Sequence, residues 1–509
     1  MLNYWWVTRP KRNLTPVPEL LAVATEISYD TEWAGQTGTH ISLEEALEKA
    51  GLKRVGERRD QRGSGGRTHM ALLKSLGLVF KQETTNKLML TLAGEAIMTG
   101  ESPVAVIRNQ ILKYQFPSSY TSKGSSKVHE RFKIRPFRFM LRLLSDSRIM
   151  YLTQEEIGKI IIVEAETESD KCYEHIVERI HEFRDKGDAC IDPDFERKYT
   201  SFTNANDIAN TVINWLEYTQ YVGRENKQLK ILEDKQAEVD ELLSTTPPFI
   251  DRPTSQEYYQ RKYGVDPNHK KDTRNLLETK SITPAIIAEQ KIKRAYISEA
   301  LKRPIAKITP ELIDTIVERT GFHDKVVEET LLRLYPRGSV NAFMAEYFEM
   351  AFKSREEATE FEKATVELFR DVFGYETKHV GPIGLTPDVL LLSDSEGYQA
   401  IIDNKAYPKY TISNDHHNRM VHNYIANLSR YSDSSHPLAF FSYIAGGFGK
   451  NFDSQVKNVV DASGVSGSGI TVANMIKLVE CYDAKGYTHK NLRDIFSVNR
   501  QILLGDFFD

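Results

Sequence analysis

The spacing of apolar and polar residues predicts that the chain begins with short helices followed by a β-hairpin. Apolar residues gather at 20–24, in the first expected helix, and recur with helical spacing at about 67–76, in the third. Ser42 and Glu45 have the spacing of a capping box, which places the start of the second helix at Ser42. Two short apolar runs around a polar turn, at residues 78–80 and 88–91, are expected to form the hairpin. This order is typical of a winged helix, a relative of the helix-turn-helix fold.

A second block with the same kind of pattern covers roughly residues 130–245. An apolar-periodic helix at 212–218 is followed by two short strand-like runs, so the helix-then-hairpin signal recurs. An irregular, proline-containing segment at 244–275 precedes a helical block at 283–335, in which Pro310 is a favoured first residue of a helix. We therefore expect four domains, namely two winged-helix-like domains at 1–105 and 106–245, a connector and helical linker domain at 246–336, and a last domain at 337–509.

The last domain has the pattern of an α/β layer with a central mixed sheet. The expected elements are, in order, a helix from a capping box at 354–357 to Phe373, a strand at 375–380, a hairpin at 386–405, a helix near 414–430, a strand at 438–444 and a closing β/α segment. The glycine- and serine-rich run at 464–469 is expected to be a loop.

Composition narrows the class of protein only in part. The chain has 509 residues, 27% of them charged, and a formal net charge of −4, so any nucleic-acid-binding surface must be local. Its three cysteines are scattered and lack metal-binding spacing, which argues against a disulfide framework and a structural zinc site. The sequence shows no signal peptide and no apolar run of membrane-spanning length. We therefore expect a cytoplasmic, soluble, multidomain protein.

The hairpin at 386–405 carries the residues with the most informative chemistry. Asp403 and Lys405 are two apart on the second strand and point to the same face, and Asp388 starts the partner strand. Two carboxylates at one edge repel each other unless a cation lies between them, and oxygen ligands suit Mg²⁺. A neighbouring ammonium group can orient a water or stabilise charge on a phosphate. The pattern indicates metal-dependent hydrolysis of phosphodiester bonds, with an exposed hairpin edge and a structural ion pair as the alternative.

Basic residues gather in places that could contact DNA. Before the third helix, a glycine-rich loop at 63–66 leads into a helix N-terminus suited to phosphate contact. The basic residues of this segment are Lys53, Arg54, Arg58, Arg59, Arg62 and Arg67. Arg135 and Arg138 lie among phenylalanines in the second block, and Lys450 follows a glycine-rich turn after the 438–444 strand. For each of them, a solvated charged surface is the alternative.

The motif around the hairpin resembles a known family of nucleases. Pro387-Asp388 followed by Asp403-Asn404-Lys405 matches the pattern of the PD-(D/E)xK nuclease superfamily. Residues 374–381 and 443–451 also resemble, in order and spacing, the cleavage domain of FokI. The whole chain resembles the FokI, AlwI and BstNBI group of type IIS restriction and nicking endonucleases. This resemblance implies α+β winged-helix-like recognition domains followed by an α/β PD-(D/E)xK nuclease domain.

The resemblance also implies roles for individual residues. Asp388 and Asp403 would bind Mg²⁺, and Lys405 would position or activate the attacking water. Glu367, on the preceding helix, would support the metal shell. The partner would be double-stranded DNA, read at a short asymmetric site by the N-terminal region of a monomer and cut at a fixed distance. Such an enzyme belongs to a bacterial restriction–modification system.

The sequence departs from that group in the helix at 415–424. FokI pairs two cleavage domains through an acidic and a basic residue one turn apart on this helix, and no such pair is evident in this sequence. Transient dimerisation for double-strand cleavage and strand-specific nicking by one copy are therefore both open. Further alternatives are a structure-directed PD-(D/E)xK repair nuclease and a non-catalytic winged-helix transcription regulator. The complete set of Asp388, Asp403 and Lys405 favours catalysis over the regulator.

Overall fold

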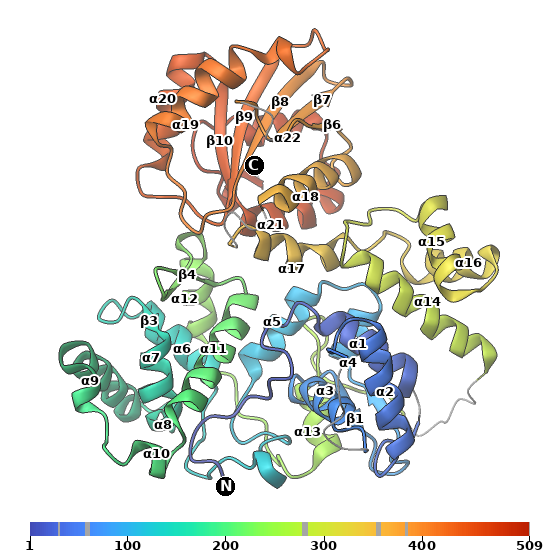
Figure 1. Cartoon of the computed structure of the whole chain (residues 1–509), viewed down its shortest axis with the longest axis vertical. Coiled ribbons are helices and arrows are strands. Elements are labelled where there is room, and N and C mark those ends of the chain that lie inside the picture. Colours follow the sequence, from blue (N-terminus) through green and yellow to red (C-terminus); the bar gives the residue numbers. More distant parts are fainter. Residues whose placement is uncertain (29–30, 56–61, 277–282, 353–357, 382–384, 508–509) are drawn as a thin grey trace. The chain divides into compact units, whose positions relative to one another are not determined.

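The computed structural model describes residues 1–28, 31–55, 62–276, 283–352, 358–381 and 385–507. The capping box expected at 354–357 and the expected DNA-binding residues Arg58 and Arg59 lie outside these ranges. The chain divides into two compact units, the first comprising residues 1–299 and 308–336 and the second comprising 300–307 and 337–509. It is a multidomain α+β protein, and its second unit is built around a mixed sheet (Figure 1). No helix in the described ranges is both long and apolar enough to cross a membrane.

The first unit opens with helices and a hairpin in the expected order. These elements are α1 Val17–Ser28, α2 Thr37–Lys49, α3 Ser64–Ser75, and the antiparallel strands β1 Val79–Lys81 and β2 Leu88–Leu90. The helix start expected at Ser42 is wrong, because α2 begins at Thr37 and Ser42 lies inside the helix. The buried ring of His40 contacts the Trp33 carbonyl oxygen through Nε2 at 2.9 Å. This contact links the first turn of α2 to the segment just before the helix.

Helices α2 and α3 approach closely because glycines line their contact. A Cβ atom at Gly66 would lie 2.4 Å from the His40 carbonyl oxygen, and one at Gly63 would lie 2.7 Å from the His40 carbonyl carbon. A Cβ atom at Gly65 would lie 2.6 Å from Oε1 of Glu44. The glycine-rich run expected to contact phosphate therefore has a structural reason of its own, since only hydrogen fits between the two helices.

The remainder of the first unit is largely helical. Its helices are α4 Leu92–Met98, α5 Pro103–Lys113, α6 Pro136–Ser145, α7 Gln154–Glu156, α8 Ile162–Glu164, α9 Asp170–Lys186, α10 Phe195–Lys198, α11 Phe202–Tyr218, α12 Gln236–Ser244, α13 Gln256–Tyr263, α14 Pro284–Ala300, α15 Pro310–Thr320 and α16 Asp324–Leu334. The strands β3 Leu152–Thr153, β4 Val222–Glu225 and β5 Gln228–Ile231 form a small sheet in the order β3-β5-β4. The helix expected at 212–218 is the end of α11, and the two runs after it pair as the expected hairpin. Helix α15 begins at Pro310 as expected, with Thr309 as its N-cap.

The second unit wraps helices around one mixed sheet. Its elements are α17 Val340–Met350, α18 Ala358–Asp371, β6 Glu376–His379, β7 Val389–Ser393, β8 Tyr398–Lys405, α19 Asn414–Asn418, the π-helix η6 Arg419–Ile425, β9 Leu438–Ala445, α20 Phe452–Ser463, β10 Ser466–Thr471, α21 Val472–Lys485 and α22 His489–Phe496. The strand order is β10-β9-β8-β7-β6; β6, β7 and β8 run antiparallel, whereas β8, β9 and β10 run parallel. The mixed sheet expected from the sequence is confirmed. Helix α18 packs on β6, β7 and β8, whereas α20 packs on β10 and η6 (Figure 1).

The glycine- and serine-rich run expected to be a loop forms strand β10, so that expectation is wrong. A Cβ atom at Gly467 would lie 2.1 Å from the ring of Phe441 on β9. A Cβ atom at Gly469 would lie 2.4 Å from the ring of Phe452 on α20. These glycines make room for the large rings that pack against a buried strand.

Candidate active site

The sheet of the second unit brings Asp388, Asp403 and Lys405 together. Val389 of β7 pairs with Ile402 of β8, so Asp388 lies opposite Asp403 in the same antiparallel register. Strand alternation points Asp403 and Lys405 to one face, and their side chains form an ion pair with 2.7 Å between Nζ and Oδ2. Two carboxylates and one ammonium group thus share one edge of the sheet.

The carboxylate of Asp388 accepts a hydrogen bond from the backbone, and its pKa is shifted. The N–H of Asn404 donates to Oδ2 of Asp388 at 2.6 Å. Burial and then the negative charge of Asp403 raise the pKa of Asp388 well above its ordinary value, against the opposing charge of Lys405. A carboxylate that its neighbour destabilises in this way gains strongly from a cation placed between the two.

The ammonium group of Lys405 is largely enclosed and remains charged. Burial alone would lower its pKa, but the charges of Asp403 and Asp388 outweigh burial and raise it. Its Nζ also lies 6.0 Å from the centre of the Tyr410 ring. Lys405 is therefore a hydrogen-bond donor and a cation in this structure, rather than a neutral base.

The donor set of the site fits a magnesium ion. Oδ1 of Asp403 is buried and has no hydrogen-bond partner among the described residues, so the Asp403 carboxylate has an acceptor position that the protein leaves unused. No group of three or more His, Cys, Asp and Glu side chains in the described part of the chain is arranged to hold a metal by itself. Mg²⁺ is usually bound by one or two carboxylates, and waters and substrate phosphates complete its shell. Asp388 and Asp403 meet that requirement.

Of the glutamates Glu362 and Glu367 on α18, Glu362 is the one whose charge acts on Asp388. The charge of Glu362 helps to raise the pKa of Asp388, and its Oε2 lies 2.9 Å from Nε2 of His379 on β6. Glu367 lies roughly 140° further around the axis of α18. Burial raises the pKa of Glu367, and the largest charge effect on it comes from Arg370 of the same helix. Sequence reasoning missed Glu362 because apolar spacing alone did not show which polar face of the helix meets the sheet.

A buried hydrogen-bond network fixes α18 against the strand that carries the site. Nδ2 of Asn404 donates to Oγ1 of Thr365 at 2.7 Å, and the Tyr347 hydroxyl lies 2.8 Å from the same atom. Asn404 alternates with Asp403, so it points to the opposite face of β8, where α18 packs. Because all three members of the network are buried, they fix the position of the Asn404 N–H that holds Asp388.

Aromatic side chains cover the face to which Asp403 points. Tyr410, Tyr424 and Tyr443 belong to the buried cluster on this face. Burial and then the charge of Asp403 raise the pKa of Tyr443 well above its ordinary value, so its hydroxyl stays protonated. His416 extends the layer, with Nδ1 3.0 Å from the Tyr410 hydroxyl. These rings therefore form one wall of the site.

An acidic and a basic residue do lie one turn apart on the helix after the motif. Asp415 of α19 and Arg419 of η6 are four residues apart and form an ion pair of 2.8 Å. This finding corrects the interpretation that no such pair is present in this segment. Within the single chain, the two charges are paired with each other.

The basic residues before α3 have different surroundings. The ammonium group of Lys53 lies 2.5 Å from Oε1 of Glu48, which commits it to a structural ion pair. Arg54 and Arg62 are exposed. The guanidinium group of the partly buried Arg67 donates to the Arg62 carbonyl oxygen. Arg54 is thus better placed than Lys53 to reach a phosphate.

Arg135 and Arg138 lie inside the first unit. Arg135 is 3% exposed, and its guanidinium group binds the carboxylate of Glu168. Arg138 donates to the carbonyl oxygens of Leu242 and Thr245, and burial lowers its pKa. The structure places both arginines on internal acceptors, where they fasten the end of α12 and the segment after it, rather than on a surface that could meet DNA.

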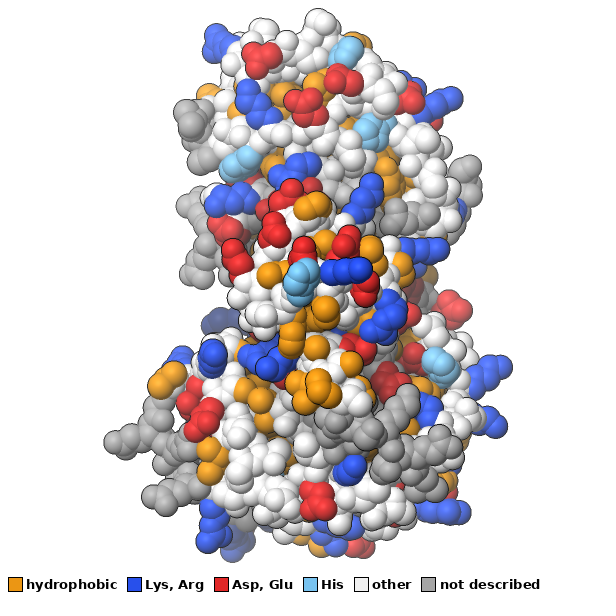
Figure 2. Space-filling view, turned by 90° about the vertical axis from the view of Figure 1, so that its right-hand side faces the viewer, with side chains coloured by type: hydrophobic (Ala, Val, Ile, Leu, Met, Phe, Trp, Pro, Cys, Tyr) orange, Lys and Arg blue, Asp and Glu red, His pale blue; other side chains and the backbone are white. Residues whose placement is uncertain are grey.

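Charged side chains of both signs are interspersed on the surface. Over the described residues in Figure 2, Lys and Arg side chains alternate with Asp and Glu side chains, in keeping with the formal net charge of −4. Lys450 is exposed at the turn after β9. DNA binding on such a surface depends on local basic residues rather than on a broad positive field.

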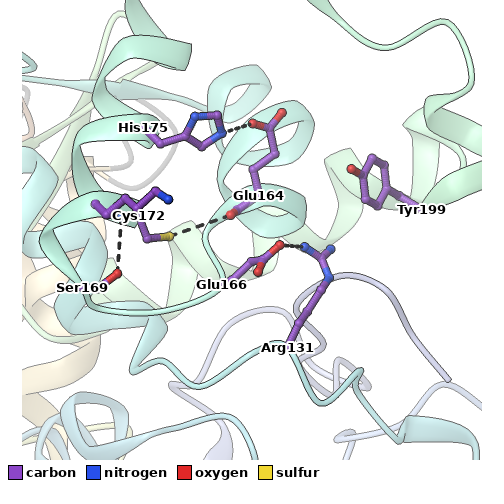
Figure 3. Close-up of a pocket in the computed structure, with 8 residues that line it drawn as sticks. Arg131, Glu164, Glu166, Ser169, Cys172, His175 and Tyr199 are labelled. Carbon is purple, nitrogen blue, oxygen red and sulfur yellow. Dashed lines mark hydrogen bonds and ion pairs between the residues drawn. The ribbon is translucent and has the colours of Figure 1, made fainter.

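A polar pocket of about 400 Å³ is lined by residues of the first unit (Figure 3). Nε2 of His175 lies 3.1 Å from Oε2 of Glu164 across it. The guanidinium group of Arg131 binds the Glu166 carboxylate and stacks near the Tyr199 ring. The carboxylates of Glu164 and Glu166 are thus already engaged within the first unit, whereas Asp388 and Asp403 belong to the second.

Two segments of the chain match families of restriction-endonuclease domains. Residues 321–503 match the family model of the FokI cleavage domain. Residues 105–248 match the family model of the N-terminal domain of the type II restriction endonuclease HgaI. The resemblance to type IIS restriction endonucleases of the FokI group is therefore confirmed by two independent matches.

Solved structures of two endonucleases are also similar to the chain. The restriction endonuclease FokI is 15% identical, with a TM-score of 0.30, over 99% of this chain and 100% of that chain. The binding domain of the BpuJ1 endonuclease, solved in complex with pyrene- and phenanthrene-modified DNA, is 14% identical, with a TM-score of 0.34, over 52% of this chain and 95% of that chain. None of the curated proteins matches the chain.

Proposed function

We propose that this protein is a sequence-specific type IIS restriction endonuclease, which uses Mg²⁺ to hydrolyse DNA phosphodiester bonds at a fixed distance from a short asymmetric site. The observation that carries the proposal is the convergence of Asp388, Asp403 and Lys405 on one edge of a mixed sheet. These residues lie within the segment that matches the FokI cleavage domain. The substrate is double-stranded DNA.

Asp388 and Asp403 would hold the metal through their carboxylate oxygens. When bound, Mg²⁺ supplies a Lewis acid that acidifies a nearby water and neutralises charge on the scissile phosphate. The raised pKa of Asp388 favours a cation here. The Asn404 N–H keeps Asp388 in register with Asp403 while the substrate binds.

Lys405 would act on the phosphate and the attacking water. In this structure its ammonium group pairs with the Asp403 carboxylate, and it would be free to move to the phosphate once a cation balanced that charge. It then donates hydrogen bonds to the water and to a phosphate oxygen, which aligns the attack opposite the 3′ oxygen. A bond forms between the water oxygen and phosphorus as the P–O3′ bond breaks, the water gives up a proton and the 3′ oxygen takes one up, so the products carry a 5′-phosphate and a 3′-hydroxyl.

Glu362 is the helix carboxylate that we assign to the support of this site. Its Oε2 is bound to His379, one strand away from Asp388, so it can hold a water in the metal shell. The first unit would read the DNA sequence in the manner of a winged helix, with α3 at the major groove and Arg54 on a phosphate.

Digestion of plasmid DNA with the purified protein tests the proposal. We expect discrete fragments in the presence of Mg²⁺, with ends at a constant offset from one short sequence. Asp403→Ala should abolish cleavage and keep binding to that sequence. Full activity of this variant at ordinary Mg²⁺ would contradict the assignment.

The same digest separates the alternatives. Nicked circles that do not become linear would indicate strand-specific cleavage by one copy. Linear products would indicate cuts in both strands, which two copies can make. Cuts at branched or damaged DNA only would indicate a repair nuclease, and intact DNA with site-specific binding would indicate a transcription regulator.

A further inference from the structure

Tyr443 has a feature that the proposed chemistry leaves unexplained. Its side chain is fully buried, and its hydroxyl has no hydrogen-bond partner in the part of the chain that the structure describes. The ring packs against Tyr410, Phe441 and Phe452, with centroid distances of 5.4, 5.9 and 6.2 Å. A phenylalanine would keep all of these ring contacts without burying an unpaired polar atom, so the hydroxyl needs a separate reason.

The position of Tyr443 beside Asp403 supplies that reason. In the parallel register of β8 and β9, Tyr443 is the partner of Asp403. Asp403 is 2% exposed; Lys405 occupies its Oδ2, whereas its Oδ1 has no hydrogen-bond partner among the described residues. The Tyr443 hydroxyl is a buried donor without an acceptor, and Oδ1 of Asp403 is a buried acceptor without a donor, among the described residues. The two residues are direct partners on neighbouring strands. The charge of Asp403 also has the largest charge effect on the Tyr443 hydroxyl.

We propose that Tyr443 is a positioning residue for Asp403, because its hydroxyl is linked to the Asp403 carboxylate by one water molecule that it donates to and that donates to the carboxylate in turn. This inference rests on the proposed nuclease function. A hydrogen bond to one carboxylate oxygen fixes the rotation of the group and turns the other oxygen toward the metal. Lys405 can then leave Oδ2 for the phosphate without freeing the carboxylate to rotate.

The test compares Tyr443→Phe with Tyr259→Phe in the full chain. Tyr259 is also buried with a hydroxyl that lacks a partner among the described residues, but it belongs to the first unit. Cleavage rates are measured over a series of Mg²⁺ concentrations. The affinity for Mn²⁺ without DNA is measured by electron paramagnetic resonance of the free ion, which needs no catalytic activity.

We expect Tyr443→Phe to raise the Mg²⁺ concentration for half-maximal cleavage by about 10-fold and to weaken Mn²⁺ binding by a similar factor. The rate at saturating Mg²⁺ should recover to within about twofold of the wild-type rate, because the lost group acts through the metal ligand. Tyr259→Phe should leave both quantities unchanged. The thermal midpoint of Tyr443→Phe should stay close to that of the wild type, because the phenylalanine ring keeps the packing against Tyr410, Phe441 and Phe452.

Unchanged Mg²⁺ dependence together with unchanged Mn²⁺ affinity in Tyr443→Phe would overturn the proposal. Equal losses in both variants would overturn it too, because they would reflect general packing. Failure of the wild-type protein to cleave DNA at any Mg²⁺ concentration would instead refute the proposed function. The Mn²⁺ titration would still decide whether Tyr443 supports Asp403.

Discussion

Glu362 and Glu367 lie on one helix but on different faces, and only the first is near the carboxylates. Glu362 is bound to His379 and acts on the charge of Asp388, whereas Glu367 interacts mainly with Arg370 of its own helix and also with Arg303. We expect Glu362→Gln to lower kcat/KM by about 10- to 100-fold, as loss of a supporting group around a metal does. Steady-state cleavage of a labelled duplex provides the measurement.

Glu367→Gln is the matched control for this prediction, because it makes the same change five positions along α18. Its kcat/KM should stay within about twofold of the wild-type value. A larger loss of kcat/KM in Glu367→Gln than in Glu362→Gln would show that the face of α18 carrying Glu367, rather than the face carrying Glu362, supports the site.

Lys113 makes the stability of the first unit depend on pH. Its ammonium group donates to the carbonyl oxygens of Tyr263 and Val265 at 2.8 and 2.6 Å. Burial lowers its pKa to about 7, against the opposing charge of Asp266. In the unfolded chain the pKa returns to about 10.4. Between about pH 7 and about pH 10.4, Lys113 is protonated to a greater extent in the unfolded chain than in the folded chain. The contribution of Lys113 to the free energy of unfolding therefore rises with pH over this range, and it is least favourable below about pH 7.

Replacement of Lys113 by methionine should remove this dependence. We expect the gain in the free energy of unfolding from pH 7 to pH 9 to be smaller in Lys113→Met than in the wild type by about 2 kcal/mol. Urea unfolding at the two pH values, followed by circular dichroism, gives the comparison. If the free energy of unfolding changed equally with pH in the two proteins, the Lys113 amine would not be the cause of the pH dependence.

At the scale of elements, the close contact of α2 with α3 depends on a glycine, which has no side chain. A Cβ atom at Gly66 would lie 2.4 Å from the His40 carbonyl oxygen, whereas Gly38, in α2, has open space around it. We expect Gly66→Ala to destabilise the fold by about 1–3 kcal/mol, because the two helices must separate. Gly38→Ala should be neutral or stabilise by about 0.5 kcal/mol through helix propensity. Equal thermal midpoints for the two variants would contradict this account.

Elements with strong local patterns can be predicted from the sequence, whereas those set by tertiary contacts cannot. The hairpin after α11 and the helix start at Pro310 are present as expected because turn residues and proline act locally. The start of α2 differs from the expected one because the contact of His40 with Trp33 lies outside the capping signal. Strand β10 has the local pattern of a loop, since its glycines are required by rings that are distant in sequence.

The candidate site could also be predicted only in part from the sequence. The spacing of Asp403 and Lys405 follows from strand alternation, so the amino-acid sequence alone predicts that they share a face. The face of α18 that meets the sheet depends on the contact of Thr365 with Asn404, which no local pattern contains. The unpartnered hydroxyl of Tyr443 could not be predicted either, because burial of a polar atom is a property of the packed core.

At the scale of the whole molecule, two compact units suggest that binding and cleavage can be changed separately. The carboxylates of the proposed chemistry belong to the second unit, and the exposed Arg54 belongs to the first. A variant of one unit should therefore alter one activity and leave the other. This division makes DNA affinity a direct measure of the first unit once cleavage is blocked.

In a cleavage-blocked Asp403→Asn background, we expect Arg54→Ala to lower the dependence of DNA affinity on salt. Loss of one phosphate contact reduces the slope of log affinity against log salt concentration by about 0.9. Lys53→Gln is the neighbouring control, because the Lys53 ammonium group is already bound to Glu48 and should contribute little to the slope. Fluorescence anisotropy of a labelled duplex over a range of salt concentrations gives both values. A larger change in the slope for Lys53→Gln than for Arg54→Ala would move the phosphate contact to Lys53 and show that its ion pair opens on DNA.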